Sequence, residues 1–428
     1  ACKGLGLETV AVYSTADKDS LHVKLADEAL CIGEARPSES YLNIPAIIAA
    51  AEVSGAQAIH PGYGFLSENA EFVDICNSNG IIFIGPSAEN IRVMGDKNQA
   101  RETCRAIGIP LVPGSNGCVQ DSTMAIEVAE KIGYPLLIKA VAGGGGKGMR
   151  IVTTPSELES AYNTTVNEAT AAFGSGQVYF EKLIQQPRHV EIQILSDSTG
   201  HAVHIGERDC SIQRRHQKLI EESPCPVLKP AVRHAMTEAA LKIVRSMHYE
   251  GAGTIEFLLD KDQNFYFIEM NTRIQVEHPV SEFVTGINLV AQQIAIAQTG
   301  KLSLTQDEIR FYGHAIEFRI NAEDPKRNFA PSPGKLDLFL PPGGFGVRVD
   351  SHAYPGYSIP PYYDSLVAKL IVWGIDRTEA IRRAKRALSE FVIDGIPTTQ
   401  SLFLDIIETD AFKSGILDTH FLEQSELL

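Results

Sequence analysis

The chain has 428 residues, which is enough for about two to four domains, and its 44% hydrophobic and 21% charged residues are typical of a globular protein. A net charge of −15 argues against nucleic-acid binding through a basic surface, and no apolar run approaches the length of a membrane span. The seven cysteines have no paired framework, so we expect free, mostly buried thiols and a reducing compartment.

The first part of the chain, residues 1–95, alternates short strands with helices, and this alternation predicts a parallel sheet. The helix expected over 67–80 would begin at Ser67 as N-cap and end at Gly80. The other elements expected here are strands at 8–14, 57–64 and 81–86 and a helix at 41–55.

Two connecting helices are expected over 96–134, and strands dominate after them. The expected strands are 134–140, 149–154, 178–184, 189–197, 202–209, 254–260, 264–271, 315–321 and 365–374. The expected helices are 156–173, 231–248, 288–299, 377–391 and 398–413. A stretch rich in proline and glycine, 325–344, indicates a loop region.

The strands at 254–260 and 264–271 predict a hairpin. Its short polar loop would pair Asp260 with Phe265, and the same register places Glu256 directly opposite Glu269. Facing carboxylates destabilise a sheet unless one is protonated or a cation lies between them, and Mg²⁺ prefers such oxygen ligands. Asn271 follows on the same face. We interpret this face as a metal site, with a solvent-facing acidic edge as the alternative.

A glycine-rich loop in the segment IKAVAGGGGKGMR, residues 138–150, lies between two expected strands. Glycines allow backbone N–H groups to approach phosphate oxygens closely. The segment lacks the following helix of a dinucleotide-binding motif, and the Walker pattern is absent. Together with the acidic pair, the loop indicates a lid over a nucleotide triphosphate; a flexible hairpin tip is the alternative.

A basic run, GERDCSIQRRHQK at 206–218, follows a strand in this acidic protein. Such a run is most often a solvated loop. The alternative is that it holds a small anion beside the metal-bound phosphates. Its basic side chains are Arg208, Arg214, Arg215, His216 and Lys218.

Taken together, these stretches closely resemble the biotin carboxylase family of the ATP-grasp superfamily. The matching segments span almost the whole chain in the family's order: HPGYGFLSEN (60–69), MGDKNQAR (94–101), KAVAGGGGKGMR (139–150), PRHVEIQ (187–193), GERDCSIQRRHQK (206–218), EMNTRIQVEHPV (269–280), GHAIEFRINAEDP (313–325) and YYDSLVAKL (362–370). The strand and loop with which the family usually begins is absent, and Lys147 stands where the family often has arginine.

The resemblance implies an ATP-grasp fold of mixed α/β and α+β class. A Rossmann-like N-terminal domain, lacking its first strand, would occupy 1–95. The ATP-grasp domain would occupy 96–315, with a glycine-rich lid at about 112–184, and a mixed α/β C-terminal domain would occupy 316–428.

The resemblance also implies a reaction. ATP phosphorylates bicarbonate to carboxyphosphate, which decomposes to CO₂ and phosphate, and deprotonated N1 of biotin captures the CO₂. The residues expected to bind ATP are Lys97, Lys139, Gly144, Gly145, Gly146, Met149, Glu181, Lys182, Leu183, His189, Gln213, His216 and Leu258. Mg²⁺, with Mn²⁺ as an alternative, would be held by Glu256, Glu269 and Asn271.

The same resemblance assigns the polar residues that follow the hairpin. Bicarbonate would be held by Arg273, Gln275, the backbone of Val276 and Lys218. Glu277 would be the general base, with an ion pair to Arg273 as the alternative. The expected catalytic residues are therefore Glu277, Lys218, Arg273 and Arg319.

Biotin would be held by Tyr63, Gly64 and Arg319. Arg319 would stabilise the enolate oxygen of biotin electrostatically, and a structural salt bridge to Glu317 or Glu323 is the alternative.

No methionine of the chain precedes a lysine, so the family's biotin attachment pattern is absent here, and biotin is expected as a substrate held on another protein or segment, with a carrier protein favoured. The expected partners are this carrier, carboxyltransferase subunits and a second copy of the chain, in a bacterial cytoplasm or a plastid stroma. Acetyl-CoA carboxylase of fatty acid synthesis is the favoured system; propionyl-CoA and pyruvate systems are alternatives. A carbamoyl-phosphate synthetase half and a non-catalytic nucleotide-binding fragment are further alternatives.

Overall fold

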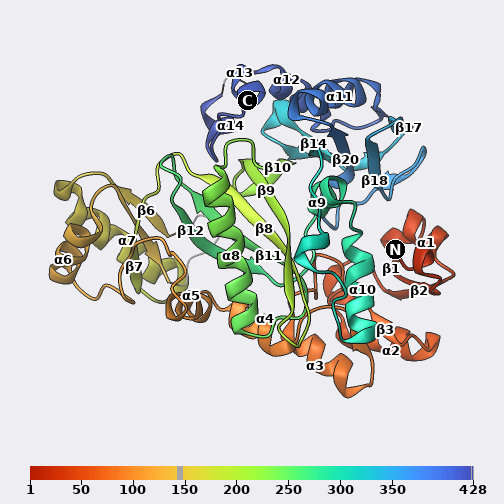
Figure 1. The fold of residues 1–428 in the computed structure, drawn as a ribbon, viewed down its shortest axis with the longest axis horizontal. Helices are drawn as coiled ribbons and strands as arrows, with labels where there is room; N and C mark the ends of the chain where they lie inside the picture. Colours follow the sequence, from red (N-terminus) through yellow and green to blue (C-terminus); the bar gives the residue numbers. More distant parts are fainter. Residues whose placement is uncertain (142–147, 426, 428) are drawn as a thin grey trace.

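The computed structural model describes residues 1–141, 148–425 and 427, and its centre is one eight-stranded antiparallel sheet (Figure 1). Its strands in spatial order are β12 (Phe265–Asn271), β11 (Gly251–Leu259), β8 (Arg188–Ser196), β9 (Ala202–Arg214), β10 (Gln217–Ser223), β13 (His314–Asn321), β20 (Leu366–Gly374) and β18 (Val347–Ser351). The domain boundary expected at 315/316 falls inside β13, which pairs with β10. The sheet is therefore continuous across that position.

One face of this sheet is an apolar core. In β8, Val190, Ile192 and Ile194 pack against α8 (Pro230–Ser246). In β13, alternate residues pack beneath α11 (Arg377–Glu390) and α12 (Gln400–Glu408). Each large apolar side chain buried in this way contributes about 1.5–3 kcal/mol, so this face accounts for much of the stability of the sheet.

The opposite face of the sheet is also buried, but part of it is lined by polar side chains. His189, Glu191 and Gln193 alternate with the apolar residues of β8 and point to this side, where they are buried. The helices α9 (His278–Thr285) and α10 (Leu289–Thr299) contact the strands of the sheet from this side. Buried charged groups require partners, so this face is where a functional site is expected.

The N-terminal part of the chain contains two parallel strand pairs. β1 (Val10–Ser14) pairs with β2 (Glu28–Gly33), and β3 (Ala58–Ile59) pairs with β4 (Ile82–Phe83). The expected parallel arrangement is confirmed, but the pairs form two separate two-stranded sheets, and β2 was not expected. The helices are α1 (Leu21–Leu25), α2 (Ile44–Ser54), α3 (Ala70–Ser78) and α4 (Ala88–Gly95). The N-cap expected at Ser67 is wrong, because α3 begins after Asn69, whose side chain accepts from the Phe72 N–H at 2.8 Å.

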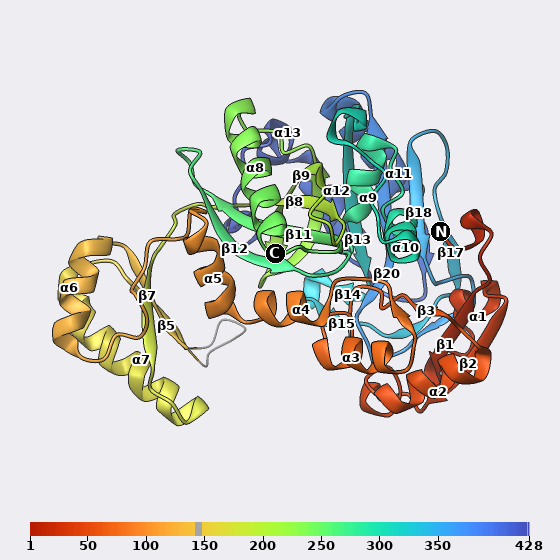
Figure 2. The ribbon, with the colours of Figure 1, turned by 60° about the horizontal axis from the view of Figure 1, so that its bottom comes forward.

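A smaller lobe stands apart from the main sheet in both ribbon views (Figures 1 and 2). It consists of α6 (Ser122–Ile132), α7 (Leu158–Phe173) and a three-stranded antiparallel sheet. The strands in spatial order are β6 (Met149–Val152), β5 (Leu136–Ala140) and β7 (Val178–Lys182). These elements confirm the expected ones, and they enclose a hydrophobic core of their own. The glycines and Lys147 of the glycine-rich loop lie outside the described residues, which end at 141 and resume at 148.

The remaining elements are α5 (Lys97–Ala106), α13 (Asp410–Ser414), α14 (Phe421–Gln424) and the short strands β14 (Glu323–Asp324), β15 (Ala330–Pro331), β16 (Gly334–Lys335), β17 (Leu338–Leu340), β19 (Ser358–Ile359) and β21 (Val392–Asp394). The helix expected at 398–413 is two helices, because Thr409 ends α12 and caps α13. In the described parts of the chain, no single helix is long and apolar enough to cross a membrane; α9 and α10 pass that test only as a pair, bent by 92°.

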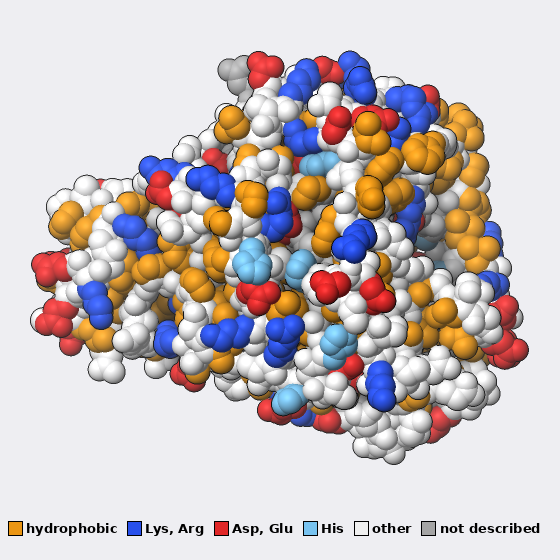
Figure 3. All heavy atoms as spheres, in the orientation of Figure 1, with side chains coloured by type: hydrophobic (Ala, Val, Ile, Leu, Met, Phe, Trp, Pro, Cys, Tyr) orange, Lys and Arg blue, Asp and Glu red, His pale blue; other side chains and the backbone are white. Residues whose placement is uncertain are grey.

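The surface and the cysteines agree with the composition. Basic and acidic side chains are interspersed on the face shown in Figure 3. All seven cysteines are free, and four of them, Cys76, Cys104, Cys210 and Cys225, are buried.

Candidate active site

The hairpin of β11 and β12 brings the two expected metal-binding carboxylates together. Glu256 lies directly opposite Glu269, as the sequence predicts, although the loop register was wrong. Phe265 pairs with Leu259 rather than with Asp260, and an irregularity between Glu256 and Phe257 shifts the register again. The irregularity compensates for the one-residue difference at the loop, so Glu256 and Glu269 still face each other.

The carboxylates of Glu256 and Glu269 form a site suited to a divalent cation. Burial and the negative charge of Glu256 raise the pKa of Glu269. Within the described chain, Glu269 accepts no hydrogen bond, so its oxygens are free to ligate. The Asn271 side chain donates to Glu256 Oε1 at 2.8 Å, which places its amide beside the pair. The carboxylate oxygens of the pair, with Glu269 as the one without an ion-pair partner among the described residues, are ligands of the kind that Mg²⁺ prefers.

Lys218 is the centre of a cluster of carboxylates. Its Nζ lies 2.6 Å from Glu191 Oε2, 2.9 Å from Glu256 Oε1 and 2.8 Å from Glu277 Oε1. Burial opposes the charged form of Lys218, but these three carboxylates raise its pKa well above the ordinary value. The ammonium therefore links the expected metal site to the expected general base.

The interpretation of the basic run as a solvated loop is wrong for most of its length. The run forms the adjacent strands β9 and β10, joined by a two-residue turn at Arg215 and His216. Both turn residues have positive φ, 48° and 66°, which non-glycine residues rarely adopt, and both are exposed. The missed strand β10 is what carries Lys218 into the interior.

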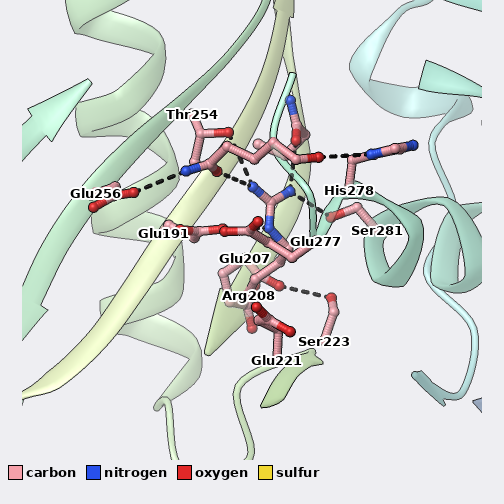
Figure 4. A network of polar contacts seen from close by, with 12 residues as sticks. Glu191, Glu207, Arg208, Glu221, Ser223, Thr254, Glu256, Glu277, His278 and Ser281 are labelled. Carbon is pink, nitrogen blue, oxygen red and sulfur yellow. Dashed lines mark hydrogen bonds and ion pairs between the residues drawn. The ribbon is translucent and has the colours of Figure 1, made fainter. Parts of the chain in front are cut away.

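Arg208, from the same run, is completely buried and has protein partners on every side (Figure 4). Its Nε donates to Glu191 at 2.5 Å, and its Nη2 donates to Gln275 Oε1 at 2.8 Å. The remaining donors contact Gln193, Thr254 and Ser281. Because the donors of Arg208 are occupied, it holds other side chains of the site in place rather than an anion.

Glu277 lies at the N-terminus of α9 and is 1% exposed. Its two oxygens are held separately, Oε1 by Lys218 and Oε2 by Arg319 Nη2 at 2.9 Å. Burial opposes ionisation, but Lys218 and Arg319 hold the pKa of Glu277 below its ordinary value. An ionised carboxylate at neutral pH can accept a proton, as a general base must.

The two alternative ion pairs considered for Arg273 and Arg319 are wrong. Arg273 Nε donates to Glu68 Oε2 at 2.9 Å instead of pairing with Glu277. Arg319 Nε donates to Glu221 Oε1 at 2.6 Å, rather than to Glu317 or Glu323.

The expected bicarbonate ligands are brought to one region. Arg273 Nη2 donates to Asn271 Oδ1 and Gln275 Nε2 donates to Glu256 Oε1, both at 2.9 Å. The Val276 carbonyl accepts from Lys369 Nζ at 2.7 Å. Lys369 and Glu68 were not predicted; they fix this segment from positions distant in the sequence.

The expected nucleotide residues fall into two groups. In the lobe, Lys139 and Arg101 both pair with the Glu181 side chain, and Lys182 Nζ donates to the Tyr134 carbonyl at 2.8 Å. The Leu183 N–H donates to Pro135, and Met149 begins β6. Gly144, Gly145 and Gly146 lie outside the described residues.

The second group lies on or next to the main sheet. His189 Nε2 is 3.0 Å from Glu256 Oε2, and although burial opposes it, this carboxylate raises the pKa of His189 to about 9. Leu258 pairs with His189, and Gln213 pairs with Lys218 across the strands. His216 lies in the exposed turn, and Lys97 begins α5, close enough for its charge to act on Glu269.

Tyr63, one of the residues expected at biotin, lies within range of the charges of Glu317 and Arg319. Burial and the charge of Glu317 raise the pKa of the Tyr63 hydroxyl, and the positive charge of Arg319 opposes this effect. The Tyr63 side chain is exposed. A Cβ at Gly64 would meet no atom within 4 Å, so the backbone next to Tyr63 is open.

A buried polar sheet face with facing carboxylates, next to a lobe that carries a glycine-rich loop, defines an ATP-grasp enzyme. Three family models match consecutive parts of the chain: the biotin carboxylase N-terminal domain at 1–91, the ATP-binding domain of the carbamoyl-phosphate synthase L chain at 96–305 and the biotin carboxylase C-terminal domain at 317–424. The two flanking matches decide against the carbamoyl-phosphate synthetase alternative.

Relatives with known names agree. The chain is 57% identical over 424 residues to a biotin carboxylase of Nostoc sp., covering 99% of this chain and 95% of that protein. It is 51% identical to a pyruvate carboxylase component of Methanothermobacter thermautotrophicus, covering 99% of this chain and 86% of that protein. The chain belongs to the biotin carboxylase family.

Solved structures give the same result. The biotin carboxylase–β-γ-ATP complex from Campylobacter jejuni has a TM-score of 0.92 and 52% identity, over 99% of this chain and 95% of that one. The bicarbonate-bound biotin carboxylase domain of a thermophilic 2-oxoglutarate carboxylase has a TM-score of 0.95 and 47% identity, over 99% and 94%. The ATP-grasp fold and the class of enzyme, an ATP-dependent biotin carboxylase, follow from these matches.

Proposed function

We propose that this chain is the biotin carboxylase component of an acetyl-CoA carboxylase and that its buried charge cluster carries out the reaction. The observation that carries the proposal is the position of Glu277, whose two oxygens are divided between Lys218 and Arg319. This geometry supports a role for Glu277 as one general base that serves both bicarbonate, near Lys218, and biotin, near Arg319.

In the first step, bicarbonate lies against Arg273, Gln275 and Lys218. A planar guanidinium suits a planar carbonate, because it donates two parallel hydrogen bonds. Glu277 takes the bicarbonate proton, the freed oxygen attacks the γ-phosphorus of ATP, and ADP leaves with the electron pair of the broken P–O bond. The products are carboxyphosphate and a protonated Glu277.

The ATP phosphates would be positioned by Lys97, Lys139, His189 and the lid. Glu256, Glu269 and Asn271 would hold Mg²⁺ or Mn²⁺, which when bound neutralises charge on the transferred phosphoryl group. Gln213 and His216 would lie on the phosphate side, and Glu181, Lys182, Leu183 and Leu258 on the adenine side.

In the second step, carboxyphosphate breaks into CO₂ and phosphate, the phosphate takes the N1 proton of biotin, and N1 attacks CO₂. Arg319 would stabilise the enolate oxygen that develops on the ureido ring. Tyr63 and the open backbone at Gly64 would contact the ring from the solvent side.

The proposal extends to partners. The biotin would be carried by a separate carrier protein, and carboxyltransferase subunits would take the carboxyl group to acetyl-CoA in fatty acid synthesis. The names of relatives include pyruvate and 2-oxoglutarate carboxylases, so a pyruvate or other acyl-CoA acceptor is the second candidate. A solved relative is described as a biotin carboxylase domain dimer, which supports a homodimer here. Bacterial and chloroplastic relatives support a bacterial cytoplasm or a plastid stroma.

Phosphate release from MgATP, measured with and without bicarbonate and free biotin, tests this function. We expect release that requires bicarbonate and rises with biotin. Binding of ATP without any response to biotin would instead support the non-catalytic nucleotide-binding fragment. Replacing free biotin by carrier proteins from acetyl-CoA and pyruvate carboxylases then ranks the acceptor systems by kcat/KM.

A further inference from the structure

Two buried glutamates behind Arg319 have no role in the steps above. Glu221 on β10 lies directly opposite Glu317 on β13, so their side chains project from neighbouring positions on the same face of the sheet. Both residues are 0% exposed. Oε2 of Glu221 and both oxygens of Glu317 have no hydrogen-bond partner among the described residues. A buried carboxylate without partners is costly, so this pair requires an explanation.

The charges around the pair do not neutralise two carboxylates. Arg319 contacts Glu221 and is shared with Glu277. Lys369 donates to the Val276 carbonyl and also lies 3.7 Å from Asp350. Besides each other, the two carboxylates face Arg319 from β13, Lys218 from β10, Cys210 from β9, Lys369 from β20, Glu277 from the start of α9 and Tyr63 from its loop.

We propose that Glu221 and Glu317 share a single proton at neutral pH and act together as positioning residues for Arg319. In this state one carboxylate is enough to hold the guanidinium in place through its Nε. The second carboxyl is neutral, so it leaves the remaining positive charge of Arg319 for the substrate. This inference rests on the proposed role of Arg319 at the enolate oxygen of biotin.

The electrostatics of the pair agree with the geometry. Burial raises the pKa of Glu221 to about 7. The positive charge of Arg319 opposes this effect, and the negative charge of Glu277 adds to it. Burial also raises the pKa of Glu317 well above its ordinary value. The positive charge of Lys369 opposes this effect, and the negative charge of Glu221 adds to it. The pair loses this proton only as the pH rises through the raised pKa of Glu317. The second negative charge then competes with substrate for Arg319, and the biotin-dependent rate should fall.

Infrared spectroscopy of Glu317→Gln tests for the proton directly. Wild-type protein at about pH 7 should show the carbonyl stretch of a buried protonated carboxylic acid, shifted in D₂O, and the wild-type-minus-variant spectrum should contain it. Glu221→Gln should also weaken or shift the band, because Glu317 then no longer faces a second negative charge. Glu222→Gln is the matched control: Glu222 is buried but ionised, since His314 and Arg377 hold its pKa at about 2 against the effect of burial.

The second readout is the pH profile of biotin-dependent phosphate release. Glu317→Gln mimics the neutral carboxyl, so it should keep activity of the wild-type order and lose the decline above neutral pH. A band that persists in both Glu317→Gln and Glu221→Gln, or an unchanged alkaline decline in Glu317→Gln, would overturn the proposal. The infrared result needs no turnover, so it separates failure of this inference from failure of the proposed function.

Discussion

Replacing Lys218 by methionine removes the cation at the centre of the site. The substitution tests whether this cation stabilises the three carboxylates around it. Lys218 Nζ contacts three carboxylates at 2.6, 2.8 and 2.9 Å, and all of these groups are nearly or completely buried. Methionine keeps much of the length and the apolar stem but leaves the three negative charges without this partner. Breaking a buried pair in this way costs about 3–5 kcal/mol, which is a large part of the stability of a typical domain.

Lys218→Met should also change the pH dependence of phosphate release. The positive charge of Lys218 is what most lowers the pKa of Glu277 against the effect of burial, so Lys218→Met should raise that pKa. The base then becomes protonated at higher pH. The acidic limb of bicarbonate-dependent phosphate release should therefore move to higher pH, in addition to a large fall in the maximal rate.

The assays are guanidinium unfolding followed by tryptophan fluorescence and circular dichroism, and phosphate release over a pH series. Lys385→Met is the matched control, because Lys385 pairs with Glu408 on the surface and both side chains are exposed. It should leave the midpoint and the pH profile unchanged. A Lys218→Met protein whose free energy of unfolding lies within about 1 kcal/mol of the wild-type value, and whose acidic limb does not move, would contradict this role of Lys218.

Three further predictions follow from the site. Glu277→Gln should lower bicarbonate-dependent phosphate release by about 10²–10⁴-fold while binding of a fluorescent ATP analogue persists; a rate near wild type would remove Glu277 as the base. Glu269→Gln should raise the Mg²⁺ concentration needed for half-maximal activity, and an unchanged Mg²⁺ requirement would place the metal elsewhere. Glu68→Gln should raise the KM for bicarbonate by about two- to fivefold, the size expected for a partly exposed ion pair, because Glu68 holds Arg273; an effect on kcat alone would contradict that role.

The parts of the site that the sequence predicted are those that a short segment encodes. The facing pair Glu256 and Glu269 lies on one hairpin, so period-2 alternation and a short loop are enough to bring them together. The register was wrong by one residue at the loop, and the local irregularity that corrects it has no sequence signature. The period-2 alternation of the strands does not show what the polar residues do. Their expected roles came from the resemblance of whole motifs to a known family.

The parts that the sequence did not predict depend on contacts between distant segments. Glu68 holds Arg273 across 205 positions, and Lys369 holds the Val276 carbonyl across 93. Arg208 was expected near the end of a strand at 202–209 and also at the start of a run interpreted as a charged loop, because nothing in a run of basic residues distinguishes a solvated turn from two strands that enter the interior. Its burial follows from the pairing of β9 with β8, which places it opposite Glu191.

The transfer of ¹⁴C from bicarbonate to biotin in the presence of MgATP is the most direct test of the central claim, that Glu277 and Arg319 connect a bicarbonate site to a biotin site. Wild-type protein should form labelled carboxybiotin. Glu277→Gln should lose both labelled product and phosphate release, whereas Arg319→Met should keep bicarbonate-dependent phosphate release and lose the labelled product. Labelled biotin formed at the wild-type rate by Arg319→Met, or by Glu277→Gln, would contradict the assignment.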